Sequence, residues 1–225
     1  MTPPPPSGLA RLLQLASASL PVSGFAYSRG LETAVEGGWV RDADTAGAWV
    51  IGLLERQGAG VDVPVVLRLH RAWAAGDDAA VARWAALHEA TRETAELRAE
   101  GRFVGESLAR LAVALGAVTA AEVARERRSH LAMWALLGLR WGLDARLTAW
   151  ALLWAGLEAQ VQAAVKLVPL GQTDGQRLLG RGGDALGAVL ARGEAVGDEE
   201  IGASAHGLAI ASALHETQRT RLFRS

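Results

Sequence analysis

Apolar residues recur at spacings of three, four or seven along most of the chain, and the clearest example lies between positions 92 and 115. Positions with these spacings fall on one face of an α-helix, so the pattern predicts an amphipathic helix that packs its apolar face against the core. The residues on this face are Leu97, Val104, Leu108, Leu111 and Leu115.

Residues 144–168 repeat the pattern but are apolar almost all round the predicted helix. Trp154 and Leu157 lie on the apolar face, while Leu152 and Leu153 extend it to the other side. A helix that is hydrophobic all round is buried on all sides. We therefore expect this helix at the centre of the fold.

Further helices are separated by glycines and by the expected N-caps Asp42, Asp77, Thr119 and Asp144. Alanine, leucine, arginine and glutamate dominate the composition, and no repeat of solenoid length is visible. The sequence therefore predicts an all-α protein, a single irregular helical bundle of about ten helices. The additional helices are predicted at residues 9–18, 30–36, 43–57, 63–75, 79–89 and 120–139.

Composition divides the chain into three parts. Residues 1–8 include four consecutive prolines, which form neither helix nor sheet, so we expect a flexible leader there. The helical domain is expected over residues 9–214. Residues 215–225, HETQRTRLFRS, form a short tail.

Charge and composition exclude several classes of partner. The 23 basic and 24 acidic side chains leave no net field to attract nucleic acid, and the uncharged stretches are too short to span a membrane. The N-terminus lacks the pattern of a secretory signal, so a cytoplasmic location is expected. Eight tryptophans and positive mean hydropathy indicate more apolar surface than a monomer needs, which favours self-association or a permanent partner.

Signatures of catalysis are missing from the sequence. It has no cysteine and no phosphate-binding loop, and we interpret its glycine-rich pieces, residues 58–60 and 180–183, as helix ends and linkers. The histidines lack metal-site spacing, and Glu199 and Glu200 have the composition of a solvated loop. We assign no catalytic residue, metal ligand or cofactor. A helical hydrolase remains a weaker alternative.

Residues 20–32, LPVSGFAYSRGLE, place a proline, two glycines and two aromatic residues in one turn between helices. So dense a turn is typical of a loop with a binding role. The alternative is a tight corner between helices in which Phe25 and Tyr27 fill the core.

Residues 166–178, KLVPLGQTDGQRL, break an apolar helix at Pro169 and Gly171, and a new helix is expected to begin with Thr173 as its cap. Lys166 is the only lysine in the chain. Its ammonium group is either a contact for a partner or a charge that interacts favourably with the C-terminal end of its helix.

The tail carries Leu222 and Phe223 among three arginines. Apolar residues on a frayed end do not usually belong to a core, so docking into a groove of a partner explains them better. Three arginines are few for a nucleic-acid tail. We expect removal of residues 217–225 to abolish partner binding and to leave the melting temperature nearly unchanged.

Four blocks of the sequence, in this order, resemble recurring blocks of the urease accessory protein UreF family. They are LLQLAS at residues 12–17, LPVSGFAYSRGLE at 20–32, VKLVPLGQTDGQRLL at 165–179 and HETQ…RLFRS at 215–225. The resemblance spans nearly the whole chain. It implies a non-enzymatic helical chaperone that takes part in nickel insertion into urease.

The resemblance also implies specific partners. A UreF-like chain forms a homodimer, binds the accessory protein UreD, also called UreH, and with it recruits the nickel-carrying GTPase UreG to apo-urease. Nickel and GTP are then expected on the GTPase. A different class of function is open: a metallochaperone that binds nickel through His206 and His215.

By matching position, the resemblance assigns partner contacts to residues of three blocks. The N-terminal block and the tail are expected to bind the UreD-like protein, and the Lys166 region to bind the GTPase or to form the dimer interface. Arg29, Ala209, Leu214 and Arg219 depart from the family pattern. The assigned residues are Phe25, Tyr27, Gly30, Leu31, Glu32, Lys166, Gln172, Gln176, His215, Glu216, Arg221, Leu222, Phe223 and Arg224.

Overall fold

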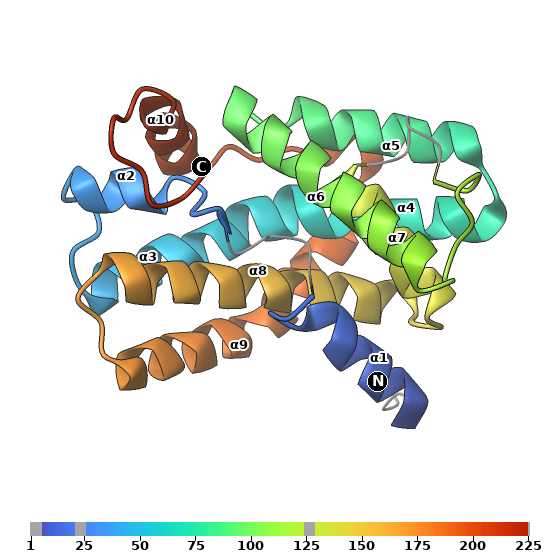
Figure 1. Ribbon diagram of the computed structural model, residues 1–225, viewed down its shortest axis with the longest axis horizontal. Helices are drawn as coiled ribbons and strands as arrows, with labels where there is room; N and C mark the ends of the chain where they lie inside the picture. The colour runs from blue at the N-terminus through green and yellow to red at the C-terminus, as the bar shows by residue number, and fades with distance from the viewer. Residues whose placement is uncertain (1–5, 21–25, 124–128, 225) are drawn as a thin grey trace.

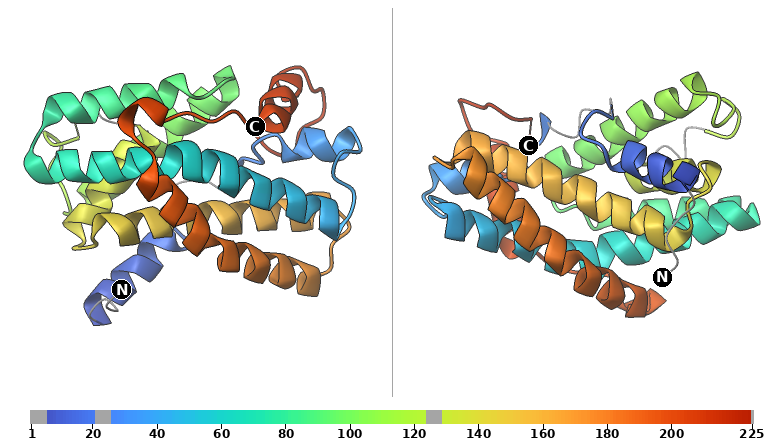
Figure 2. Two further views of the ribbon diagram at one scale, coloured as in Figure 1. Left: turned by 180° about the vertical axis from the view of Figure 1, so that it is seen from behind. Right: turned by 90° about the horizontal axis from the view of Figure 1, so that it is seen from below.

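The computed structural model describes residues 6–20, 26–123 and 129–224, and within them the protein is all-α with no strand, as the sequence predicts. Figures 1 and 2 show an irregular bundle of helices α1 to α10. A π-helix, η2, spans Leu54–Asp62 and a 3-10 turn, η4, spans Asp198–Glu200. The α-helices are α1 Pro6–Ala16, α2 Leu31–Glu36, α3 Ala43–Leu53, α4 Val63–Ala75, α5 Asp78–Ala90, α6 Ala95–Ala114, α7 His130–Arg140, α8 Ala145–Leu167, α9 Gln172–Ala195 and α10 His206–His215.

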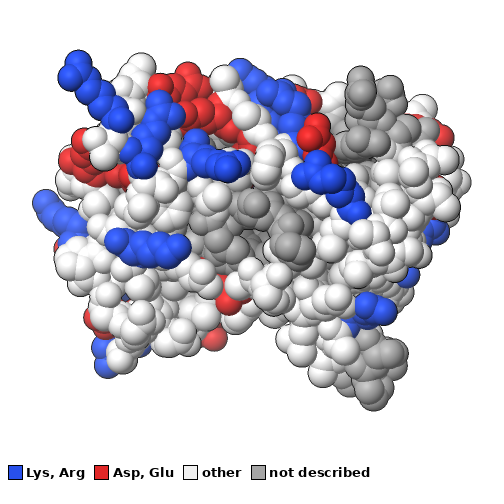
Figure 3. All heavy atoms as spheres, viewed as in Figure 1, with Lys and Arg blue, Asp and Glu red and all other residues white. Residues whose placement is uncertain are grey.

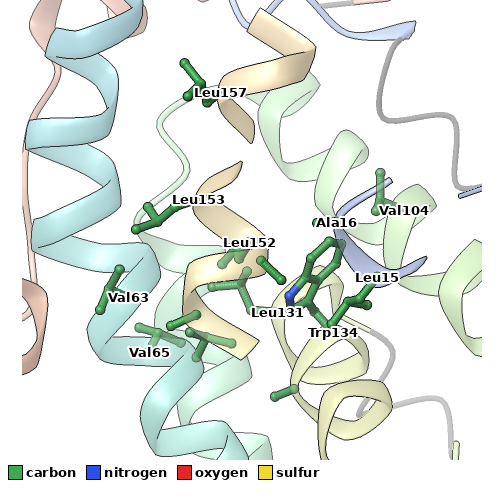
Figure 4. Packing of buried hydrophobic residues seen from close by; sticks show 14 of the residues in the cluster. Leu15, Ala16, Val63, Val65, Val104, Leu131, Trp134, Leu152, Leu153 and Leu157 are labelled. Carbon is green, nitrogen blue, oxygen red and sulfur yellow. The ribbon is translucent and has the colours of Figure 1, made fainter. Parts of the chain in front are cut away.

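Helix α8 crosses the middle of the bundle, as its apolar pattern predicts, but it is not buried on all sides (Figure 1). Trp150 and Trp154 are half-buried, and Gln162 and Lys166 are exposed. Leu157 and Ala164 on this helix are fully buried. Figure 4 shows side chains of α1, α4, α6, α7 and α8 converging on one core. The indole of Trp134 is part of that core, and its N–H donates to the carbonyl of Thr148 at 3.1 Å, so its polar atom is satisfied.

Close packing of α9 on α8 explains the glycine-rich stretch at residues 180–183. This stretch lies inside α9, so its interpretation as a linker is wrong. A Cβ atom at Gly182 would lie 2.4 Å from Cδ1 of Leu157, closer than two carbon atoms approach. Glycine is therefore needed here for contact between the helices. Residues 58–60 are likewise inside an element, the π-helix η2.

Several helix ends follow the predicted caps, while others do not. The side chains of Asp42, Asp77 and Asp144 accept backbone N–H groups at the starts of α3, α5 and α8. Thr119 does not cap an α-helix: it forms a single turn with Glu122 through hydrogen bonds. Helix α7 begins at residue 130 and not at 120, and Gly171 stands as the cap of α9 in place of Thr173.

The N-terminal helix begins at Pro6, inside the segment expected to be a flexible leader. Proline is accepted in the first turn of a helix because its missing N–H has no partner there. Residues 1–5 of the expected leader lie outside the described residues. Among the helices that the structure describes, none combines the length and hydropathy that crossing a bilayer requires.

Candidate partner-binding site

The tail folds back onto the protein as an ordered segment (Figures 1 and 2). Glu32 of α2 receives it: its two carboxylate oxygens accept the backbone N–H groups of Leu222 at 2.6 Å and Phe223 at 2.9 Å. The N–H of Arg224 donates to the carbonyl of Ala26 at 2.9 Å. The end of the chain is therefore tied to the segment before α2.

The two apolar residues of the tail point in different directions. Phe223 is only 7% exposed and packs in the main core, whereas Leu222 is 68% exposed. The expectation that neither belongs to the core is therefore wrong for Phe223. The physical reason is Glu32, whose carboxylate binds the backbone at this point and lets the aromatic ring enter the core.

His215, the last residue of α10, lies fully buried beneath the tail. Its Nδ1 is 2.7 Å from Oε2 of Glu96, and its Nε2 is 3.5 Å from Oε2 of Glu32. The other oxygen of Glu96 accepts from Nη1 of Arg221 at 2.7 Å. Glu216 turns away from this group, and its carboxylate accepts the N–H of Ala95 at the start of α6.

The N-terminal block lies directly against the tail. Tyr27 is buried, and this burial raises the pKa of its hydroxyl although a hydrogen bond with Arg224 opposes the shift. Leu31 is fully buried. The structural interpretation of this block, a corner with an aromatic residue in the core, thus holds for Tyr27. Phe25 lies outside the described residues.

Gly30 lets α10 approach this block closely. Its φ of +75° belongs to the left-handed region, and a Cβ atom there would lie 3.0 Å from Cβ of Ala211 and 3.2 Å from the backbone nitrogen of Ser212. Glycine satisfies both constraints at once. Arg29 also has positive φ, 51°, and its Nε donates to Oε1 of Glu100 at 2.9 Å.

The middle block is divided between the tail and another surface. Lys166 is exposed near the end of α8, and its Nζ lies 5.8 Å from the centre of the Phe223 ring, so it joins the tail. Gln172 and Gln176 are exposed at the start of α9. Figure 1 shows α9 on the side of α8 away from the tail, so the helix that carries these two glutamines lies apart from α10.

Three large apolar side chains of α10 and the tail are exposed. Ile210 and Leu214, one helical turn apart on α10, are 53% and 50% exposed, and Leu222 is exposed as well. Figure 3 shows basic and acidic side chains interspersed along the edge where α6, α10 and the tail lie. This edge therefore offers apolar contacts beside charges of both signs, a composition that suits protein recognition.

Behind the N-terminal block, the bundle contains a partly open cavity of about 120 Å³. Two ion pairs cross its wall, Arg29 with Glu100 and Arg92 with Asp62, and Arg92 also donates to Gln57 at 2.5 Å. The charges that the cavity buries are thus paired. Its polar lining includes Ser17, Tyr27, Arg29, Gln57, Asp62, His88, Arg92, Glu100, His130 and Gln160.

The titration of the cavity residues reflects burial and these pairs. Burial, together with the charge of Arg92, lowers the pKa of His88 to about 4. Burial and Arg29 lower the pKa of His130 to about 3. Burial alone would raise the pKa of Asp62, but Arg92 and His88 hold it well below its usual range. Both histidines are therefore neutral at physiological pH.

The two histidines of the metallochaperone alternative cannot share a metal ion within one chain. His206 is exposed at the start of α10, whereas His215 is buried at its end. They are nine residues apart, about two and a half turns, and so lie on opposite faces of the helix. Within the described ranges, no group of three or more side chains able to ligate a metal ion occurs.

The fold and the docked tail define an all-α protein with a partly apolar C-terminal surface. The family model named UreF matches residues 40–182, more than half of the chain. Relatives named urease accessory protein UreF match almost end to end. The chain is 48% identical to the relative from Alkalilimnicola ehrlichii, and the match covers 97% of each chain. It is 42% identical to the relative from Chromohalobacter salexigens, and that match covers 98% of this chain and 96% of the relative. The chain belongs to the UreF family.

Some residues of this site were not found from the sequence. Glu96 and Glu100 lie 119 and 71 positions away from their partners His215 and Arg29, and no local pattern marks such pairs. Ile210 could have been found, because with Leu214 it forms an apolar pair one turn apart on a short helix close to the end of the chain.

Proposed function

We propose that this protein is a non-enzymatic scaffold for urease maturation in the cytoplasm. As a homodimer it binds a UreD-like protein, with it recruits a UreG-like GTPase to apo-urease, and couples GTP hydrolysis to nickel insertion. Nickel and GTP are bound by the GTPase. Membership of a family whose curated relatives are named urease accessory proteins supports this function.

The observation that carries the proposal is the surface made by α10 and the tail. Its backbone is held in place by Glu32, while Ile210, Leu214 and Leu222 remain exposed. An ordered backbone that presents apolar side chains costs little conformational entropy on binding. We assign this surface to the UreD-like protein, and the adjacent Lys166 to the GTPase or to the dimer interface.

Co-elution on a sizing column tests the assignment with a surface substitution. Leu222→Arg places a charge where the proposed interface needs an apolar side chain, and we expect it to abolish co-elution with the UreD-like protein. The matched control is Leu115→Arg at the other end of α6, where Leu115 is 50% exposed. Both variants should melt like the wild type because both side chains are exposed.

The results separate the alternatives clearly. Loss of co-elution for Leu222→Arg alone supports the assigned surface. Equal co-elution of both variants with the UreD-like protein would rule it out. Failure of the wild type to bind either a UreD-like or a UreG-like partner would overturn the scaffold function itself.

A further inference from the structure

His215 is the only histidine in the tail, yet it is fully buried and cannot touch a partner while the tail is docked. The two side chains that it contacts both bind the tail. Glu32 holds the N–H groups of Leu222 and Phe223, and Glu96 holds the guanidinium of Arg221. The imidazole of His215 therefore reaches the tail through these two carboxylates, while its backbone carbonyl accepts the N–H of Gln218.

The charges around the imidazole balance in only one protonation state. Glu32 faces it from α2 and Glu96 from α6, with side chains only 10% and 17% exposed. Arg221, from the tail, supplies one positive charge. Two buried carboxylates and one guanidinium leave one negative charge, which is neutralised when His215 carries protons on both ring nitrogens.

The other charged groups near the tail make contacts of their own. Arg29 pairs with Glu100, and Glu216 binds the N-terminal end of α6. Lys166 lies over the ring of Phe223, and Arg224 lies over that of Phe103.

The hydrogen bonds give the same result as the charges. When the ring is neutral, only one nitrogen can donate. If Nδ1 donates to Glu96, then the lone pair of Nε2 faces Oε2 of Glu32 at 3.5 Å, and among the described residues this buried nitrogen has no hydrogen-bond partner. A buried carboxylate that loses its opposite charge is strongly destabilised. The carboxylate affected is the one that holds the tail.

We propose that His215 is a positioning residue whose protonation sets how firmly the tail is docked. The imidazolium keeps Glu32 in place and the tail closed, and deprotonation as the pH rises loosens the tail. The inference rests on the proposed function only in that the tail is taken to be the surface that a UreD-like protein recognises. That protein would then meet a different tail conformation at acidic and at alkaline pH.

Amide hydrogen exchange of the isolated full chain, followed by NMR, tests the inference. Between about pH 6 and pH 8.5 we expect the protection factors of Leu222 and Phe223, corrected for intrinsic exchange, to fall roughly tenfold or more. The amide chemical shifts of both residues should titrate together with the ring protons of His215. Unchanged protection across this range would overturn the proposal.

Two substitutions on α10 sharpen the test. His215→Asn retains a donor for Glu96 but does not titrate, so we expect the protection factors in this variant to be independent of pH. His206→Asn alters an exposed histidine on the same helix and should behave like the wild type. Equal pH dependence of the protection factors in all three proteins would contradict a role for His215. If His215→Asn does not fold, the pH dependence of the wild-type protection factors alone decides whether the proposal stands.

Co-elution with the UreD-like protein at both pH values separates this inference from the proposed function. Protection that changes with pH while no UreD-like protein binds at either pH leaves the inference standing and overturns the function. Constant protection with binding at both pH values overturns the inference and leaves the function standing. Protection and binding that change together support both.

Discussion

Leu222 and Phe223 are neighbours in the tail with opposite exposure, and this makes them a matched pair for testing whether the tail is docked. We expect Phe223→Ala to lower the free energy of unfolding by about 3 kcal/mol, because it removes an aromatic side chain from the core. We expect Leu222→Ala to change it by less than about 0.5 kcal/mol, because that side chain is exposed.

The magnitude follows from the burial of the ring. A phenylalanine that is 7% exposed removes roughly 150 Å² of apolar surface from water, which at about 25 cal/mol per Å² corresponds to about 4 kcal/mol. This value is an upper bound, because the unfolded chain already buries part of that surface. The tail can also detach locally in this variant, and this limits the loss of stability.

Urea denaturation followed by circular dichroism measures the difference. A loss of about 3 kcal/mol shifts the midpoint by about 1 M or more, since small proteins have slopes of about 1–3 kcal/mol per M. Midpoints that agree for the wild type and both variants would refute the docked tail. From the sequence alone, loss of residues 217–225 was expected to leave melting nearly unchanged; from the contacts of the docked tail we expect a measurable destabilisation.

Three further predictions concern other parts of the protein. Lys166→Ala should weaken the complex with the GTPase on a sizing column and lower the melting temperature only slightly, since the side chain is exposed. If this variant unfolds, the ammonium group of Lys166 instead stabilises the C-terminal end of α8. Gly30→Ala should destabilise by about 1 kcal/mol or more in a urea titration, because φ is positive and Ala211 leaves no room; an unchanged midpoint would contradict the close contact. The free energy of unfolding should fall as the pH drops below about 6.5, because His88 and His130 bind protons in the unfolded state before they do so in the folded state, where their pKa values are about 4 and about 3. For His88 the loss amounts to up to about 3 kcal/mol near pH 4. A urea midpoint that stays constant between pH 7 and pH 4.5 would contradict this prediction.

The helices could be predicted where a single periodicity determines them. Helix α8 follows from its apolar pattern, and three aspartate caps mark helix starts because one side chain suffices to satisfy the first turn. Residues 120–129 have a helical composition, but Ser129 caps α7 and starts the helix later than predicted. The sequence predicts an ordinary helix and a linker where the structure has the π-helix η2, because the apolar spacing there does not distinguish the wider π-helical turn from an α-helical one.

The sequence identifies the blocks that make up the site, but it does not predict how their side chains contact one another. The blocks identify Tyr27, Glu32 and the tail, and the structure brings them together. The sequence could not show that Glu32 binds the backbone of a residue 190 positions later, because such a contact depends on the whole fold. For the same reason the burial of His215 and of Phe223 was missed.

The tie between the tail and the segment before α2 has a consequence for the order of folding. The N–H of Arg224 donates to Ala26, and Phe223 packs in the core that the earlier helices form. These contacts join residues that are far apart in the sequence, so forming them costs the entropy of closing a long loop. The helices of the bundle can therefore pack before the tail does, and α2 lacks the segment that covers it until the tail docks.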